Sequence, residues 1–443
     1  MKQQLKSGLT QAQLDAHWMP YTSNREFKKD PRIIASASGR YYFDSQGRKI
    51  FDGLSGLWCT GLGHGREEII EAVSTQLKTL DYSPGFQFGH EKSFQLAEKI
   101  TEFMPQGLNR VFFTTSGSES AETSLKMARG YWRKKGLPSK TKLIGRGLGY
   151  HGSNFGGISV GGIGGNRALF GPVVEVDHLR HTMLPENLFS KGQPEHGKTL
   201  ANELLDLIAL HDASNIAAVI VEPLSGSAGV IPPPVGYLNR LREICDEHNI
   251  LLIFDEVICC FGRMGAKTGA EAFGVVPDII NVAKQVTNGV IPMGAVIAKQ
   301  EIYDTYMEQS GAEHLLEFPH GYTYSAHPVA CAAGLATLNL LQQEKIPERV
   351  SALSDYFEQA VHSLKGCKHV TDIRNYAFTA GFSIAPASDP ALRPYLIGMK
   401  MWEKGFFVRY GGNTIQLGLP FTTEKHEIDS LINALGETFN EIA

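Results

Sequence analysis

Short, continuous apolar runs alternate with helical patterns from about residue 66 to residue 320. Most of the runs are rich in Val, Ile or Phe. Parallel strands buried on both faces have this continuous apolar pattern, so the region predicts an α/β domain with a mostly parallel central sheet. The expected strands are VFFTT (111–115), KLIG (142–145), AAVIVEP (217–223), LLIFDEV (251–257), DIINVA (278–283) and GAVIA (294–298).

Two segments near these runs have the spacing of amphipathic helices. One carries Ile69, Ile70, Val73, Leu77 and Leu80, and the other carries Tyr237, Leu238, Leu241, Ile244 and Cys245. Strands that alternate with helices in this way form open sheets, and such sheets bind their ligands at the carboxyl ends of the strands. Polar residues that directly follow the apolar runs are therefore the first candidates for a functional site.

The two ends of the chain have a different pattern. Residues 32–58 contain the alternating, turn-rich stretch RYYFDSQGRKIFDG, which predicts an antiparallel hairpin with an Asp-Ser-Gln-Gly turn. Residues 330–443 mix helical patterns with short strands such as FFVRY and TIQLGL. We therefore predict a large domain over residues 66–328 and a smaller α+β domain built from residues 1–65 and 329–443.

Composition narrows the class of protein. The chain has 443 residues and a net charge of −4, which gives no electrostatic reason to expect nucleic acid or an anionic membrane as a partner. Six scattered cysteines form neither a disulfide framework nor a CxxC metal site, and we expect no metal. The first residues lack an apolar signal core, and no apolar run approaches the roughly 18 residues that span a bilayer. These features favour a cytoplasmic protein.

Two charged residues end neighbouring apolar runs. Lys284 follows DIINVA, and Asp255 follows LLIF. A lysine at a strand end is usually a solvated surface charge, and an aspartate there is often a helix N-cap. A buried carboxylate is costly unless a cation pairs with it, so the two together indicate a site. Glu256 is the alternative carboxylate, although strand alternation places it on the opposite side from Asp255.

A hydroxyl-rich turn follows a third apolar run. Residues 115–120, Thr-Ser-Gly-Ser-Glu-Ser, precede a helix patterned by Ala121, Leu125 and Ala128, which places several donors at a helix N-terminus. Such turns are also ordinary N-caps. An amine, a carboxylate and a phosphate-binding turn are the three anchors that pyridoxal phosphate (PLP) requires: the amine for its aldehyde, the carboxylate for its ring nitrogen, and the turn for its phosphate.

Residues 147–152, Gly-Leu-Gly-Tyr-His-Gly, match the GxGxxG pattern of dinucleotide-binding sites. That pattern should open a helix, whereas the residues that follow, SNFGGISVGGIGGN, are too rich in glycine to continue as one helix. We therefore do not expect a nicotinamide cofactor. Tyr150 in this segment is a candidate for stacking on the pyridine ring.

With these motifs in view, the chain closely resembles the class III, ω-amino acid:pyruvate aminotransferases of the fold-type I PLP family. The resemblance covers nearly the whole chain. It includes AHWMPYTSNREF (16–27), DGLSGLWC (52–59), TSGSESAETSLKMAR (115–129), GYHG (149–152), VEPLSGSAGVIPPPVGY (221–237), LIFDEVICCFGRMG (252–265), AKQVTNGVIPMGAVIA (283–298) and HGYTYSAHPVACAAGLA (320–336).

The resemblance implies a role for each matching residue. Lys284 would form the Schiff base with PLP, and Asp255 would pair with the pyridinium nitrogen. Thr323 would reach the phosphate of a neighbouring subunit, which implies an obligate homodimer and leaves pairing into tetramers open. The other implied cofactor contacts are Ser116, Gly117, Ser118, Tyr150, His151, Glu222 and Val257, and the implied substrate contacts are Trp58, Phe86, Tyr150 and Arg409.

Arg409 has a physical rationale beside the resemblance. One pocket must bind pyruvate, with a carboxylate beside the reacting carbon, and then an ω-amine without one. A flexible guanidinium can pair bidentately with that carboxylate and swing away from the amine. A structural salt bridge is the alternative role for this arginine.

The expected reaction transfers an amino group from an ω-amino acid such as β-alanine, or from another primary amine, to pyruvate. Other class III enzymes remain open, including taurine, γ-aminobutyrate and diamine transaminases and an intramolecular aminomutase. A non-catalytic PLP-fold binding protein fits less well, because every anchor is present. Family positions that differ here are Cys259, Cys260, Ala326 and the GLPF segment at 418–421, and they affect the expected donor preference.

Overall fold

A seven-stranded sheet forms the centre of the computed structural model, which describes residues 8–442. Neighbouring strands in it follow the order β4, β10, β9, β8, β7, β5, β6. Their bounds are β4 Leu108–Thr114, β5 Lys142–Arg146, β6 Val176–Leu179, β7 Ile216–Val221, β8 Leu251–Asp255, β9 Ile279–Ala283 and β10 Gly294–Lys299. All pairings are parallel except those of β10, which runs antiparallel to β4 and to β9. The prediction of a mostly parallel α/β sheet is confirmed.

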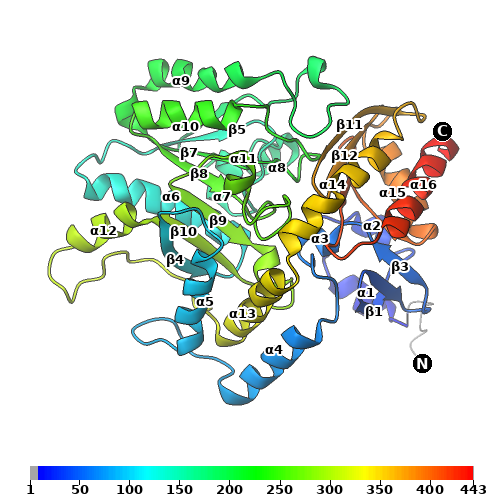
Figure 1. Ribbon diagram of the computed structural model, residues 1–443, viewed down its shortest axis with the longest axis horizontal. Coiled ribbons are helices and arrows are strands. Elements are labelled where there is room, and N and C mark those ends of the chain that lie inside the picture. Colours follow the sequence, from blue (N-terminus) through cyan, green and yellow to red (C-terminus); the bar gives the residue numbers. More distant parts are fainter. Residues whose placement is uncertain (1–7, 443) are drawn as a thin grey trace.

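The apolar strands are buried on both faces because alternate residues enter two different cores. In β9, Ile279 packs in a core with Leu125 and Ala128 of α6 (Gly117–Lys134), while Ile280 enters the larger core on the other face. Figure 1 shows helices on both sides of the sheet. They include α4 (Glu67–Thr79), α5 (Glu91–Thr101), α9 (Glu203–His211), α10 (Tyr237–Glu247), α12 (Gln300–Glu308) and α13 (Pro328–Gln343).

Two four-stranded sheets are built from the ends of the chain. One has the order β1 (Ile34–Ser38), β2 (Tyr41–Asp44), β3 (Lys49–Asp52), β13 (Phe406–Phe407), and the other β11 (Val370–Tyr376), β12 (Thr379–Ile384), β15 (Thr414–Gly418), β14 (Arg409–Gly411). The predicted hairpin is present as β2–β3, where Asp44 Oδ1 accepts the backbone N–H groups of Gln46 and Arg48.

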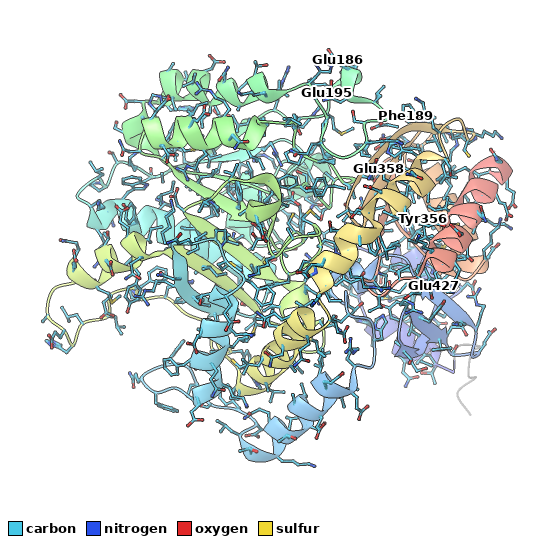
Figure 2. The ribbon with its side chains drawn as sticks, in the orientation of Figure 1. Glu186, Phe189, Glu195, Tyr356, Glu358 and Glu427 are labelled. Atoms are coloured by element: carbon cyan, nitrogen blue, oxygen red, sulfur yellow. The ribbon has the colours of Figure 1, made fainter. Side chains whose placement is uncertain are left out.

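Both ends of the chain contribute to one packed unit. Strand β13 pairs in parallel with β3, and Glu427 of the last helix accepts hydrogen bonds from Arg40 (2.9 Å) and Tyr41 (2.5 Å). Glu427 is labelled in Figure 2, and Figure 1 shows the first strands and the last helices on the same side of the molecule. These contacts support the predicted small domain, whose limits stay a prediction. The helices of this region are α14 (Ile346–His362), α15 (Leu392–Glu403) and α16 (Lys425–Glu441).

The glycine-rich segment after GxGxxG forms two short helices, α7 (Phe155–Val160) and α8 (Gly164–Phe170), so no single long helix follows that motif. The remaining α-helices are α1 (Gln11–Ala16), α2 (Asn24–Phe27), α3 (Ser55–Trp58) and α11 (Gly269–Phe273). Within residues 8–442, no helix is long and apolar enough to cross a bilayer. The same residues contain no cluster of side chains suited to hold a metal ion.

Candidate active site

A cavity of about 320 Å³ opens at the carboxyl edge of the central sheet, and we call it the strand-end cavity. Five strands that run in the same direction end here, so the residues that follow them converge although they are far apart in the sequence. The cavity wall includes Thr115, Ser116, Gly117 and Ser118 after β4, Tyr150 and His151 after β5, Glu222 after β7, Asp255 and Val257 at and after β8, and Lys284 after β9.

Lys284 reaches the cavity from a backbone conformation with positive φ (53°), directly after the extended Ala283. Removal from water lowers the pKa of its ammonium group, and the nearby Cys59 and Asp255 oppose this effect. A lowered pKa increases the fraction of neutral amine near pH 7. Lys284 is therefore suited to act as a nucleophile and as a proton carrier.

Asp255 faces the cavity, and His151 fixes its position. His151 Nδ1 lies 2.8 Å from Asp255 Oδ2, and Asp255 Oδ1 accepts the backbone N–H of Val257 at 3.2 Å. Both side chains are almost completely buried. The other ring nitrogen of His151, Nε2, has no hydrogen-bond partner among the described residues. The imidazole of His151 fixes the orientation of the Asp255 carboxylate, which can then pair with the protonated ring nitrogen of a cofactor.

Glu256, the alternative carboxylate, is fully buried and does not line the cavity. It accepts the backbone N–H groups of Gly269 (2.5 Å) and Ala270 (2.8 Å) at the start of α11. Burial raises its pKa to about 7. Glu256 therefore caps α11 in this fold and faces away from the cavity, on the side that strand alternation predicts.

Glu222 supports the segment that carries Tyr150. Its carboxylate accepts the backbone N–H of Tyr150 at 2.9 Å and that of Gly226 at 3.1 Å. Burial raises the pKa of Glu222 to about 7, and the neighbouring His151 opposes the rise. The carboxylate holds the loop after β5 against the cavity.

The hydroxyl-rich turn forms the N-terminus of α6. Ser116 is its N-cap, with Oγ accepting the N–H of Glu119 at 3.2 Å, and Ser118 Oγ accepts the N–H of Ser153 at 3.0 Å. A Cβ on Gly117 would lie 2.9 Å from a methyl group of Val257, so only glycine leaves this wall open. Backbone donors and the helix dipole converge on the cavity here, as a phosphate requires.

These residues fit PLP. Three features surround one cavity, and each matches a different part of the cofactor. The space beside Gly117, which a Cβ there would fill, suits the phosphate. The buried carboxylate of Asp255 suits the ring nitrogen, and the amine of Lys284 suits the aldehyde.

Of the predicted substrate contacts, Tyr150 lines the strand-end cavity, whereas Trp58, Phe86 and Arg409 do not, and neither does Thr323, the predicted phosphate contact of the neighbouring subunit. Trp58 is only 1% exposed, whereas Phe86 is 50% exposed and Thr323 is also exposed. Arg409 is half-buried, and its positive charge opposes the rise in the pKa of Tyr150 and adds to the lowering of the pKa of Lys284, which places it near the edge of the site. The roles of these four residues stay predictions.

The cavity wall also includes residues that sequence reasoning did not single out: Cys59, Thr287, Gly289, Ile291, Pro292 and Met293. Cys59 comes from the N-terminal part of the chain and meets Lys284 only through the tertiary fold. The others follow Lys284 within a few residues, so their proximity in sequence is the signal that could have identified them.

A lysine, an aspartate and a helix N-terminus at parallel strand ends define a PLP-dependent enzyme. Residues 22–439 match the family model described as aminotransferase class-III, and the chain belongs to this family. The family match excludes a nicotinamide cofactor at the GxGxxG segment.

Relatives of known name match along almost the whole chain. A β-alanine–pyruvate aminotransferase of Pseudomonas aeruginosa is 62% identical, over 97% of this chain and 96% of its own length. An ω-amino acid–pyruvate aminotransferase of Pseudomonas putida is 59% identical, over 98% and 97%. A PLP-bound amine transaminase from an uncultivated Pseudomonas species superposes with a TM-score of 0.90 at 35% identity, covering 97% of this chain and 99% of its own.

Proposed function

We propose that this enzyme transfers an amino group from an ω-amino acid such as β-alanine, or from another primary amine, to pyruvate, with alanine as product. Arg409 carries the proposal, because this half-buried cation at the edge of the site has no ion pair among the residues described. The names of the two Pseudomonas relatives support the same substrates.

Each residue of the site has a task in this reaction. When bound, PLP supplies an electron sink for the carbon that loses a proton. Asp255 would hold the ring nitrogen, Ser116 to Ser118 would hold the phosphate, and Tyr150 and Val257 would contact the ring. Lys284 Nζ would take the proton from the substrate carbon and return it, as general base and acid.

Arg409 explains how one pocket accepts both substrates. Burial lowers the pKa of Arg409, while Tyr150 and Tyr21 oppose the change. The guanidinium group of arginine is charged throughout the physiological pH range. A partly desolvated guanidinium binds a carboxylate with two parallel hydrogen bonds. Without a competing carboxylate in the protein, it is available to pyruvate.

The test measures alanine formation from β-alanine and pyruvate, together with spectroscopic half-reactions for β-alanine, taurine, γ-aminobutyrate, putrescine and a chiral aryl amine. In Arg409→Ala protein, we expect the kcat/KM for pyruvate to fall about 10- to 100-fold, the worth of a charged hydrogen-bond pair. An aldehyde acceptor, which has no carboxylate, should lose far less. Equal losses for both acceptors would contradict the role of Arg409, and absence of pyruvate-dependent alanine formation would contradict the proposed reaction.

We further propose that the active unit is a homodimer. Segments 82–94 and 315–324 expose large apolar side chains, and a ring contact between Tyr82 and Tyr324 joins the two segments (centroids 6.0 Å apart). The exposed side chains are Tyr82, Phe86, Phe88, Phe94, Leu315, Leu316 and Tyr324. A second copy that covers them would bring Thr323 to the phosphate of its partner.

Mixed dimers test this arrangement. Lys284→Ala and Thr323→Asp homodimers should both have little activity, the second because a carboxylate would repel the phosphate. Unfolding and refolding them together should restore activity, because a mixed dimer contains one site with both native residues. If Thr323 serves its own chain, each mixed dimer has one native Thr323 without a native Lys284, and no activity returns. Size measurements by light scattering check the dimer itself.

A cytoplasmic location remains our proposal as well. All six cysteines are free thiols, which suits a reducing compartment.

A further inference from the structure

Four consecutive residues in α3 have left-handed backbone conformations. The φ angles of Ser55, Gly56, Leu57 and Trp58 are 46°, 53°, 67° and 71°. The turn is closed by hydrogen bonds from Trp58 N to Leu54 O (2.8 Å) and from Cys59 N to Ser55 O (2.7 Å). Only glycine adopts this conformation without strain, and three of the four residues carry side chains. Surrounding contacts must therefore hold this left-handed turn in place.

Asp52 holds the start of the left-handed turn. Its fully buried carboxylate accepts the N–H groups of Leu54 (3.3 Å) and Gly56 (3.0 Å) through Oδ1. Its other oxygen lies 2.9 Å from His64 Nε2 and 3.5 Å from Thr60 Oγ1. Asp52 thus satisfies two backbone N–H groups, those of Leu54 and Gly56, at the start of the left-handed turn.

Arg263 holds the turn from the other side. Its guanidinium, in a residue only 1% exposed, donates to Ser55 Oγ (3.1 Å) and to the carbonyl of Leu419 (2.5 Å). The guanidinium also lies over the rings of Phe421 (4.5 Å to the centroid) and Trp58 (5.7 Å). No ion pair to Arg263 is present among residues 8–442. Burial lowers the pKa of Arg263, and the nearby carboxylate of Asp52 opposes this without forming an ion pair. Burying a cation that has no direct carboxylate partner is costly, which stability alone does not explain.

The left-handed turn lies between two cavities. Cys59, directly after it, lines the strand-end cavity. Gly56 and Leu57 line a second cavity of about 510 Å³, whose wall also includes Tyr21. Tyr21 is near enough to Arg409 to influence the pKa of its guanidinium, so this cavity lies close to Arg409. Within the turn, Leu57 is the side chain that faces a cavity, while the ring of Trp58 packs where a Cβ on Gly418 would lie 2.2 Å away.

We propose that Arg263 is a positioning residue, which keeps the left-handed turn strained so that Leu57 stays fixed in the wall of the second cavity, close to Arg409. The substrates that this wall selects rest on the proposed function above. Loss of Arg263 lets the turn relax toward right-handed geometry and displaces Leu57, which weakens substrate binding more than it slows the chemical step.

The strain is testable without any activity measurement. At an ordinary exposed helical position alanine is more stable than glycine, but at φ 67° the order reverses. We expect Leu57→Gly to unfold about 1–2 °C above Leu57→Ala. Leu77, in the last turn of α4, is the matched control, because it has the same side chain and nearly the same exposure (52% against 51%). There Leu77→Ala should be the more stable of the pair, and the same order at both sites would overturn the proposal.

The positioning role is tested by Arg263→Gln and Arg263→Lys, assayed with β-alanine and pyruvate. We expect KM to rise about tenfold, the worth of one charged hydrogen bond, with kcat changed less than threefold and the visible absorption of the bound cofactor retained. Arg242→Gln is the control, because Arg242 is a partly buried arginine in α10 that lines neither cavity. If the Arg263 variants have a lower unfolding temperature but an unchanged KM, Arg263 contributes only to stability and the proposal is wrong.

Two further measurements separate a folding defect from a loss of the positioning role. If Arg263→Gln does not fold, Ser55→Ala removes the hydrogen bond from Arg263, together with the one that Ser55 Oγ donates to the Gly418 carbonyl (2.6 Å), and leaves the charge. This variant should raise KM in the same direction. Unchanged KM in folded Ser55→Ala protein would overturn the proposal. If wild-type protein does not transaminate pyruvate, the proposed function fails, while the comparison of Leu57→Gly with Leu57→Ala still decides whether the turn is strained.

Discussion

Lys284→Ala protein is expected to lose transamination by about 10⁴-fold or more, because the variant has no amine at the strand ends to move the proton at the substrate carbon. Lys284 is the one lysine in the wall of the strand-end cavity among the described residues. The measurement is steady-state alanine formation at saturating cofactor. Retention of more than about 1% of turnover would exclude Lys284 as the proton carrier.

Lys299→Ala is the matched control for this variant. Lys299 also ends a strand of the same sheet, but β10 runs antiparallel, so this lysine lies at the opposite edge and pairs with Asp278 at 2.7 Å. We expect turnover within about twofold of wild type, since a surface substitution away from the site has little effect. Two lysines at strand ends thus differ in function because their strands differ in direction.

Asp255→Asn is expected to reduce turnover about 10²- to 10⁴-fold, the range typical of a lost proton-transfer or charge-stabilising group. An amide carries no charge to stabilise a protonated ring nitrogen, and it weakens the contact with His151 Nδ1. The measurement combines kcat with the visible spectrum of the bound cofactor.

Glu256→Gln is the control for Asp255, since the two buried carboxylates are adjacent in sequence and only Asp255 lines the cavity. Replacing Glu256 leaves α11 poorly capped and should lower the unfolding temperature. Turnover per folded enzyme should stay close to wild type. Equal losses of turnover in both variants would contradict the assignment of Asp255 as the functional carboxylate.

Much of this site is predictable from sequence because its residues follow continuous apolar runs. A buried parallel strand needs such a run, and parallel strands bring their carboxyl ends to one edge, so Asp255 and Lys284 converge without any knowledge of tertiary structure. The run that forms β10 has the same composition, and its reversed direction is set by the connection from β9. Composition carries no signal for that reversal.

Other features have no periodic signal at all. Strand β6 has the sequence Val-Asp-His-Leu, too short and polar to be distinguished from a loop. The left-handed turn at 55–58 contains one glycine, and its handedness depends on Asp52 and on Arg263, which is distant in sequence. Resemblance identifies Trp58 there, but only the fold places Leu57 on the cavity side.

The parallel pairing of β3 with β13 has a consequence for biosynthesis. Phe51 is in register with Phe406, and its backbone N–H donates to the carbonyl of Gly405 (2.8 Å), so the edge of β3 stays open until almost the whole chain has left the ribosome. During translation, the central sheet can form its cores before β13 is synthesised. In that interval the N-terminal hairpin has an unpaired apolar edge at β3. Until β13 covers it, that edge is a template for association with other nascent chains.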